Sequence, residues 1–228
     1  MFLDRTIGVK DTVPPRRGFA DMAEKTPREA LVEEVLGATG LALLDTLAEI
    51  WPRRKKGERG VLKLVRCGVL GTCRLEAGGR EFTACFAGKR VPEGDLAESL
   101  VAARFYVQAK LALPQLGLRP AKLFPLPAWE LDWPGRKHPV YLVPVSSRTR
   151  ALLPAAEKAL VERGARAVFV VPEKAWRLDL GFRAYRFVLE EELFETSVLR
   201  LYLPEGQEDA AHPFRAASGT TEPVVAKK

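Results

Sequence analysis

Apolar residues recur at helical spacing in three stretches near the start of the chain. Thr26-Pro27-Arg28-Glu29 is a typical helix start, because Thr can cap, Pro suits the first turn and Glu completes a capping box. The apolar positions that follow predict a helix that Gly37 and Gly40 bring to an end. A second helix is expected over residues 41–50 and a third over about 56–67.

Two stretches of strand character surround a Gly-Gly pair after the third helix. Val69–Ala77 and Arg80–Gly88 are expected to form a hairpin, because Gly78-Gly79 suits a two-residue turn with positive φ angles. One face of this hairpin is expected to join the core, through Cys73, Leu75, Phe82, Ala84 and Phe86.

The second half alternates helical and strand patterns. The continuous apolar run Ala167–Val171 predicts a fully buried central strand. The other expected elements are helices at Asp95–Leu113 and Thr149–Arg163 and strands at Lys122–Leu126, Val140–Val145, Tyr185–Leu189 and Val198–Leu203. The predicted fold class is α/β (α+β), with a right-handed crossover in an α/β unit.

These patterns predict four regions along the 228 residues. They are a flexible arm at 1–25, a three-helix and hairpin domain at 26–90, an α/β domain at 91–203 and a disordered tail at 204–228. No apolar run approaches the roughly 18 residues that a bilayer requires, and the start lacks the pattern of a secretory signal. A soluble, cytoplasmic protein without a membrane partner is therefore expected.

Composition adds two expectations. The chain has no asparagine and three glutamines, a depletion of thermolabile amides that is typical of thermophile proteins, although GC-rich coding gives the same bias. Its three cysteines form no CxxC pair, and its two histidines lie far from them, which argues against a zinc site. We expect no metal and no cofactor, with the cysteines packed as small apolar residues.

The positive charge is concentrated in one part of the chain. The net charge is +7, and residues 51–90 contain eleven Lys and Arg against three Glu. On the third helix, Arg59, Lys63 and Arg66 share the side opposite the apolar positions. A basic face in one module predicts a polyanionic partner.

Three helices followed by a Gly-Gly hairpin have the order of a winged helix-turn-helix, and Val61–Phe86 (VLKLVRCGVLGTCRLEAGGREFTACF) resembles that family. The resemblance implies that the third helix enters the major groove of DNA and that the wing contacts the backbone or minor groove. The implied DNA-binding residues are Arg53, Arg54, Lys55, Lys56, Arg59, Lys63 and Arg66, with Arg74 and Arg80 on the wing. The alternative is a solvated charge run on a scaffold used for protein contact. Double-stranded DNA is favoured over RNA, because no pair of aromatic residues is placed on a strand for base stacking.

The element order of the second half is similar to that of the restriction-endonuclease-like core. Glu130 and Asp132 lie near the position of the first acidic residue, but Val143-Pro144-Val145 stands where that family has Glu-x-Lys. The resemblance therefore implies a degenerate core, and we expect no enzyme activity. In the alternative, Lys137 and Glu157 or Glu173 would compensate. No phosphate-cradling GxxxxGK[ST] loop is present in the sequence.

A winged helix followed by a degenerate nuclease-like domain resembles plasmid replication-relaxation proteins and related mobile-element factors. The function implied is sequence-specific binding of double-stranded DNA in plasmid or phage replication initiation or in transcription repression. The alternatives are a nuclease delivered to DNA and a phage factor that docks on the host transcription machinery. Under these hypotheses, a protein of replication or transcription is expected as a further partner. A homodimer is expected through 91–203, with Phe105 and Tyr106 of the long helix at the interface; the alternative is that this helix packs on Ala167–Val171.

Overall fold

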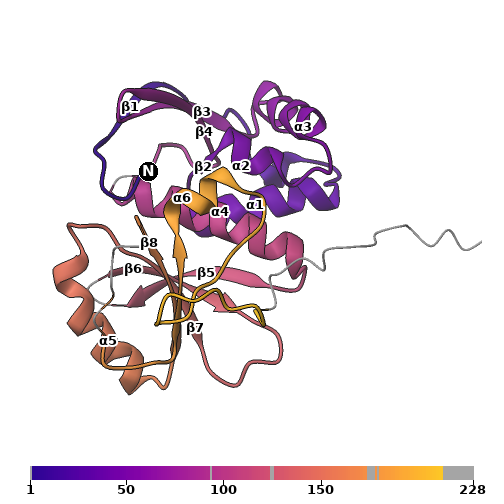
Figure 1. The fold of residues 1–228 in the computed structure, drawn as a ribbon. Helices are drawn as coiled ribbons and strands as arrows, with labels where there is room; N and C mark the ends of the chain where they lie inside the picture. Colours follow the sequence, from indigo (N-terminus) through magenta and orange to yellow (C-terminus); the bar gives the residue numbers. More distant parts are fainter. Residues whose placement is uncertain (1, 93, 124–125, 174–177, 179, 213–228) are drawn as a thin grey trace, which may run out of the picture.

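A computed structural model of the protein describes residues 2–92, 94–123, 126–173, 178 and 180–212. It is a mixed α/β structure in which two β-sheets lie at opposite ends of the molecule. Helix α4 (Leu96–Ala112) runs between them (Figure 1). No helix among the described residues is long and apolar enough to span a bilayer.

Helix α1 (Pro27–Thr39) begins with the predicted capping box. The Thr26 hydroxyl oxygen accepts a hydrogen bond from the Glu29 amide at 3.3 Å, and the Glu29 carboxylate accepts one from the Thr26 amide at 2.9 Å. The helix continues through Gly37 and ends at Gly40, whose φ of +74° is the left-handed conformation that glycine adopts without steric cost.

Helices α2 (Leu44–Ala48) and α3 (Arg54–Arg66) cross at very short range. A Cβ atom at Gly57 would lie 1.9 Å from the carbonyl oxygen of Ala48, and one at Gly60 would lie 2.7 Å from the Trp51 ring. Glycine at both positions therefore allows α3 to pack on α2 and on the loop that follows it.

The predicted helix over residues 41–50 is wrong in its first part. Ala42–Leu43 forms a short strand, β2, whose residues pair with Cys85 and Ala84 of β4 (Arg80–Phe86), and α2 begins only at Leu44. The edge of β4 satisfies the backbone groups of this apolar segment, so tertiary pairing overrides its helix propensity.

The predicted hairpin is confirmed, with β3 (Gly71–Ala77) and β4 joined by Gly78 and Gly79 at φ angles of +58° and +74°. The sheet order is β1-β3-β4-β2. Strand β1 (Ile7–Val13) pairs antiparallel with β3, so the prediction of a flexible arm is wrong for these residues. The outer edge of β3 offers unpaired amide and carbonyl groups, and the N-terminal segment, which lacks periodicity of its own, satisfies them.

The second sheet has five strands in sequence order, antiparallel from β5 to β7 and parallel from β7 to β9. The predicted buried strand is β8, which lies between β7 and β9. Helix α5 follows a short η2 turn and connects β7 to β8. The bounds are β5 Gly117–Leu123, β6 Leu126–Asp132, β7 Val140–Pro144, η2 Arg150–Leu152, α5 Leu153–Glu162, β8 Arg166–Val171, β9 Tyr185–Leu189 and α6 Glu190–Glu195.

Two predicted strands are wrong. Residues 122–126 span the connection between β5 and β6, of which 124–125 lie outside the described residues. Proline in this region argues against strands in the sequence, so β5 and β6 were not predicted with these bounds. Pro120 is tolerated in β5 because β5 is an edge strand. Residues 198–203 form no strand; among them only Tyr202 makes isolated bridges, to Phe187 and to Glu208.

The predicted disordered tail is wrong for residues 204–212, which pack against the second sheet. The Arg186 Nε atom of β9 lies 2.5 Å from the Asp209 carboxylate, and His212 is buried. The remainder of that prediction, residues 213–228, lies outside the described residues.

Helix α4 is buried within the chain. It packs against α1, α2 and β2 on one side and against β7 and α6 on the other, and the Phe105 and Tyr106 side chains are 0% exposed. The prediction that these two residues form a dimer interface is therefore wrong. In the second sheet α4 packs mainly on β7, and its apolar side chains belong to the same buried cluster as Val168 and Val170 of the central strand, which supports the alternative only in this coarser form.

We predict that Gly57→Ala destabilises the protein by roughly 1–3 kcal/mol, because the new methyl group overlaps the Ala48 carbonyl and forces the helices apart. The matched control is Gly37→Ala, at an exposed helical position with no atom within 4 Å of the added Cβ. That change should stabilise the protein by about 0.5–1 kcal/mol. Urea unfolding of both variants tests this, and equal effects would contradict the close crossing.

The Glu29 carboxylate gives a second prediction. Its pKa lies below the ordinary value of 4.5, chiefly because it accepts the Thr26 backbone hydrogen bond, with Lys63 also lowering it against the opposing effect of burial. A lowered folded-state pKa means stability that is present above pH 4.5 and is lost as the pH falls through the folded-state value. We expect Glu29→Gln to cost about 1 kcal/mol at neutral pH and to flatten the acid side of the stability profile. Glu24→Gln removes the same charge from an exposed position as a control, and an unchanged acid slope in Glu29→Gln would contradict the assignment.

Candidate nucleic-acid interface

Helix α3 presents a cationic face to solvent. Gly57, Val61 and Leu64 are buried on one side of the helix. The opposite side carries only exposed residues, which are Lys55, Lys56, Arg59, Leu62, Lys63 and Arg66. Five of these six side chains are cationic and none is acidic. The helical spacing in the sequence predicts Arg59, Lys63 and Arg66 on this side, whereas it predicts that the apolar Leu62 faces inward, which is wrong.

Two of the predicted α3 residues are engaged by acidic groups. Arg54 Nη2 lies 3.1 Å from the Asp45 carboxylate, and its Nε lies 3.0 Å from Glu58. Lys63 Nζ lies 3.5 Å from the Glu29 carboxylate, which ties α3 to the start of α1. Within the described chain no ion pair involves the remaining α3 candidates, Arg53, Lys55, Lys56, Arg59 and Arg66.

The two predicted wing residues differ in position and in charge balance. Arg80 directly follows the Gly78-Gly79 turn and is exposed at the tip of the hairpin. Arg74 lies in the middle of β3, where its guanidinium is 3.4 Å from Asp11 and 3.6 Å from Glu81. Arg74 therefore has its charge largely balanced by its neighbours.

Three cations that the sequence did not single out join this surface through the N-terminal segment. The backbone amides of Arg16 and Arg17 both donate to the Gly68 carbonyl at 2.8 Å, so their exposed side chains start beside the end of α3. The Arg5 guanidinium packs over Gly78, where a Cβ atom would be 1.6 Å from its Nη1. In the sequence, the pair Arg16-Arg17 after two prolines shows that this segment is locally basic, but nothing near it predicts that the pair lies beside α3.

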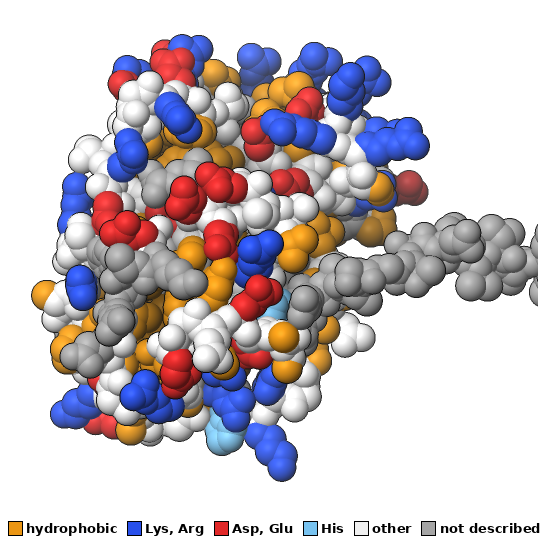
Figure 2. Space-filling view, viewed as in Figure 1, with side chains coloured by type: hydrophobic (Ala, Val, Ile, Leu, Met, Phe, Trp, Pro, Cys, Tyr) orange, Lys and Arg blue, Asp and Glu red, His pale blue; other side chains and the backbone are white. Residues whose placement is uncertain are grey.

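Figure 2 shows Lys and Arg side chains gathered over the end of the molecule that carries α3, while acidic side chains are more frequent below it. The candidate interface is defined here as the α3 face with Arg16, Arg17 and the hairpin tip. Its charge is suited to a polyanion, and α3 lies at the outer edge of the molecule (Figure 1).

Two of the three cysteines lie on the hairpin strands β3 and β4. Cys73 and Cys85 are buried, and burial raises the pKa of Cys73 to about 11 and that of Cys85 to about 12. Both are therefore protonated at neutral pH and pack as small apolar groups, as expected. Cys67 is exposed at the end of α3, so the expectation of a packed cysteine is wrong at this position.

The residues that the nuclease resemblance singles out lie on or directly after the antiparallel strands β6 and β7. Glu130 on β6 forms an ion pair with Arg119 at 2.8 Å, and Asp132 ends the strand at an exposed position. The paired strand β7 reads Val-Tyr-Leu-Val-Pro and is buried throughout. Among the residues described, no three His, Cys, Asp or Glu side chains come together as a metal-binding group.

Comparison of the chain with protein-family models, with curated proteins and with solved structures found no match in any of the three.

Proposed function

We propose that residues 26–90 are a winged helix-turn-helix that binds double-stranded DNA, with α3 as the helix that enters the major groove. The order α1, β2, α2, α3 and hairpin supports this, as does the pairing of β2 with β4 at the inner edge of the hairpin. Such a module presents one helix and one wing to the same duplex.

The observation that carries the proposal is the uniform charge of the exposed α3 face. The five cations of this face, of which only Lys63 has an acidic partner among the described residues, repel one another in the free protein, and a phosphate backbone removes that repulsion while releasing counterions. An α-helix fits the major groove, where Arg59 can grip guanine O6 and N7 with two hydrogen bonds.

Leu62 adds a second kind of contact to this face. It is 37% exposed and lies among the cations, with no apolar partner of its own on the solvent side of α3 among the described residues. An apolar side chain in the major groove packs against the 5-methyl group of thymine. The α3 face thus combines groups suited to guanine and to thymine.

The flanking cations are suited to the phosphate backbone. Arg80 and Arg5 lie at the hairpin tip, and Arg16 and Arg17 lie beside the other end of α3. Contacts of this type position a protein on the duplex without reading sequence. RNA is a weaker candidate, because Phe86 is buried and Phe82 is partly buried against the core rather than displayed for stacking.

We further propose that the protein acts in plasmid or phage replication initiation or as a repressor, and that the second sheet serves as a scaffold without nuclease chemistry. The apolar β7 supports the second part, because neither valine nor proline can bind a metal ion or orient a water molecule. Any homodimer would use a surface other than α4, since that helix is buried.

We predict that DNA affinity falls steeply with salt, with roughly five to eight phosphate contacts setting the slope. Arg59→Ala should cost about 1–3 kcal/mol on the preferred site and reduce its preference over random duplex, while Arg80→Ala should weaken both alike. Fluorescence anisotropy with both duplexes, after selection of a site from random sequence, measures these effects.

The control for that experiment is Arg163→Ala, which removes an exposed cation at the end of α5 in the other half of the molecule. The DNA affinity of the Arg163→Ala variant should equal that of the unmodified protein. A salt-independent affinity, or equal losses for Arg59→Ala and Arg163→Ala, would overturn the proposed interface. Cleavage of supercoiled DNA with magnesium, abolished by Asp132→Ala, would overturn the assignment as a non-enzyme.

A further inference from the structure

A second basic site lies in the other half of the molecule. A cavity of about 430 Å³ opens at the amino ends of β7, β8 and β9, between the β6–β7 connection and residues 201–212. Its wall includes Trp133, Arg136, Val140, Arg166, Arg186 and His212. Since β9 runs from this cavity into α6, which packs on α4, the cavity faces away from the first sheet and from α3 (Figure 1).

The cavity has an excess of positive charge. Four of its lining residues are arginines, and the single acidic one, Asp209, is used by Arg186 at 2.5 Å. That contact is the main cause of the lowered pKa of Asp209, to which the Ala211 amide and the nearby His212 also contribute, so Arg186 is the lining arginine whose charge Asp209 offsets. Neither Arg136 nor Arg166 forms an ion pair with any residue that the structure describes.

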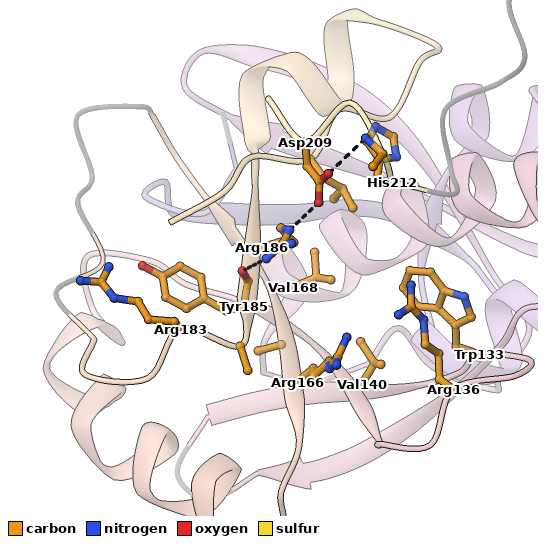
Figure 3. Close-up of a pocket in the computed structure, with 14 residues that line it drawn as sticks. Trp133, Arg136, Val140, Arg166, Val168, Arg183, Tyr185, Arg186, Asp209 and His212 are labelled. Carbon is orange, nitrogen blue, oxygen red and sulfur yellow. Dashed lines mark hydrogen bonds and ion pairs between the residues drawn. The ribbon is translucent and has the colours of Figure 1, made fainter. Parts of the chain in front are cut away.

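The side chains converge on one space. In Figure 3, Arg166 and Val140 lie side by side at the bottom of the group, the Arg136 and Trp133 pair stands on the right, and Asp209 and His212 lie at the top. Arg183 points away from this group. Two guanidinium groups without acidic partners therefore face a common volume, where their repulsion is relieved by a bound anion.

The rest of the lining is apolar and aromatic. The Arg136 guanidinium lies 4.7 Å from the centre of the Trp133 ring, which holds it in place, and Val140, Val168 and Leu201 form a buried apolar floor. Sites of roughly 300–1,000 Å³ with apolar walls and a few fixed polar groups are typical of small-molecule ligands. A duplex is too wide for such a cavity, whereas a planar base with one or more phosphates matches both its apolar floor and its arginines.

We propose that this cavity binds a nucleoside phosphate, with Arg136 and Arg166 on the phosphates and the Trp133 and valine surface beside the base. Neither guanidinium can lose its charge at any physiological pH, and each can donate two parallel hydrogen bonds to phosphate oxygens. The site is separate from the α3 face and does not depend on DNA binding there.

Isothermal titration calorimetry of the full chain with ATP, AMP and inorganic phosphate at low salt tests the proposal. We expect saturable binding of the nucleotides at one site per chain, and binding of inorganic phosphate that is weaker by roughly tenfold or more, since phosphate alone leaves the apolar floor uncovered. Arg166→Glu should weaken nucleotide binding by roughly tenfold or more, because it replaces an attractive charge by a repulsive one.

Two matched charge reversals complete the experiment. Arg163→Glu, on the α5 side of the sheet, should leave nucleotide affinity unchanged, and Arg59→Glu should abolish duplex binding while leaving nucleotide affinity unchanged. Loss of nucleotide binding in Arg59→Glu but not in Arg166→Glu would place the nucleotide on α3 and overturn the proposal. Absence of saturable nucleotide binding, or equal affinity for inorganic phosphate and ATP, would overturn it as well. Thermal unfolding of each variant confirms that the fold is intact.

Discussion

The burial of helix α4 is the constraint on which the rest of the structure depends. The helix is covered on both sides, so its polar side chains need partners from both halves of the chain. The Arg104 Nε atom donates to the Leu193 carbonyl at 2.7 Å, and the Gln108 amide nitrogen donates to the Thr196 carbonyl at 2.6 Å. These bonds satisfy carbonyl groups at the end of α6, where the helix itself provides no donors. On the other side, the Tyr106 hydroxyl contacts Glu34 of α1. A helix with polar groups fixed in both directions holds the two sheets in one arrangement, because leaving any of these buried groups without a partner is costly.

The N-terminal segment fixes the same arrangement from the outside. Phe2 packs edge-to-face with Phe82 of the hairpin and Phe194 of α6, at 5.1 Å in each case. The buried Glu190 carboxylate accepts hydrogen bonds from the amides of Phe2 and Leu3, which anchors the chain before β1 begins. The strand then runs along the hairpin. The buried Phe2, the Glu190 carboxylate and the pairing of β1 with β3 thus together determine where the cations of this segment lie relative to α3.

The two basic regions differ in how the fold handles their charge. On the candidate interface the cations point into water, where repulsion between them is weakened by solvent and salt. At the cavity of the second sheet the exposed Arg136 and Arg166 stand beside a floor of buried apolar residues, so a small anion with an apolar part can pair with the guanidinium groups and cover the floor at the same time. The first surface is therefore suited to an extended polyanion that competes with salt, and the second to a small ligand that it encloses.

The local elements of this protein could be predicted from its sequence. The Thr26 and Glu29 capping box, the Gly78-Gly79 turn, the apolar strand Ala167–Val171 and the cationic face of α3 all depend on residues within a few positions of one another. Their chemistry is set by short-range hydrogen bonds, φ angles and helical spacing, which the order of residues specifies directly.

The features that join distant segments were decided only by the tertiary structure. Ala42 and Leu43 became a strand because β4 offered an edge, residues 7–13 became a strand because β3 offered another, and Arg74 is balanced because β1 placed Asp11 beside it. The arginine cavity likewise gathers residues from β7, β8 and β9, from the connections before β7 and before β9, and from the segment after α6. No local pattern could reveal these, since an unpaired sheet edge or an uncompensated charge acts on whichever segment the fold brings to it.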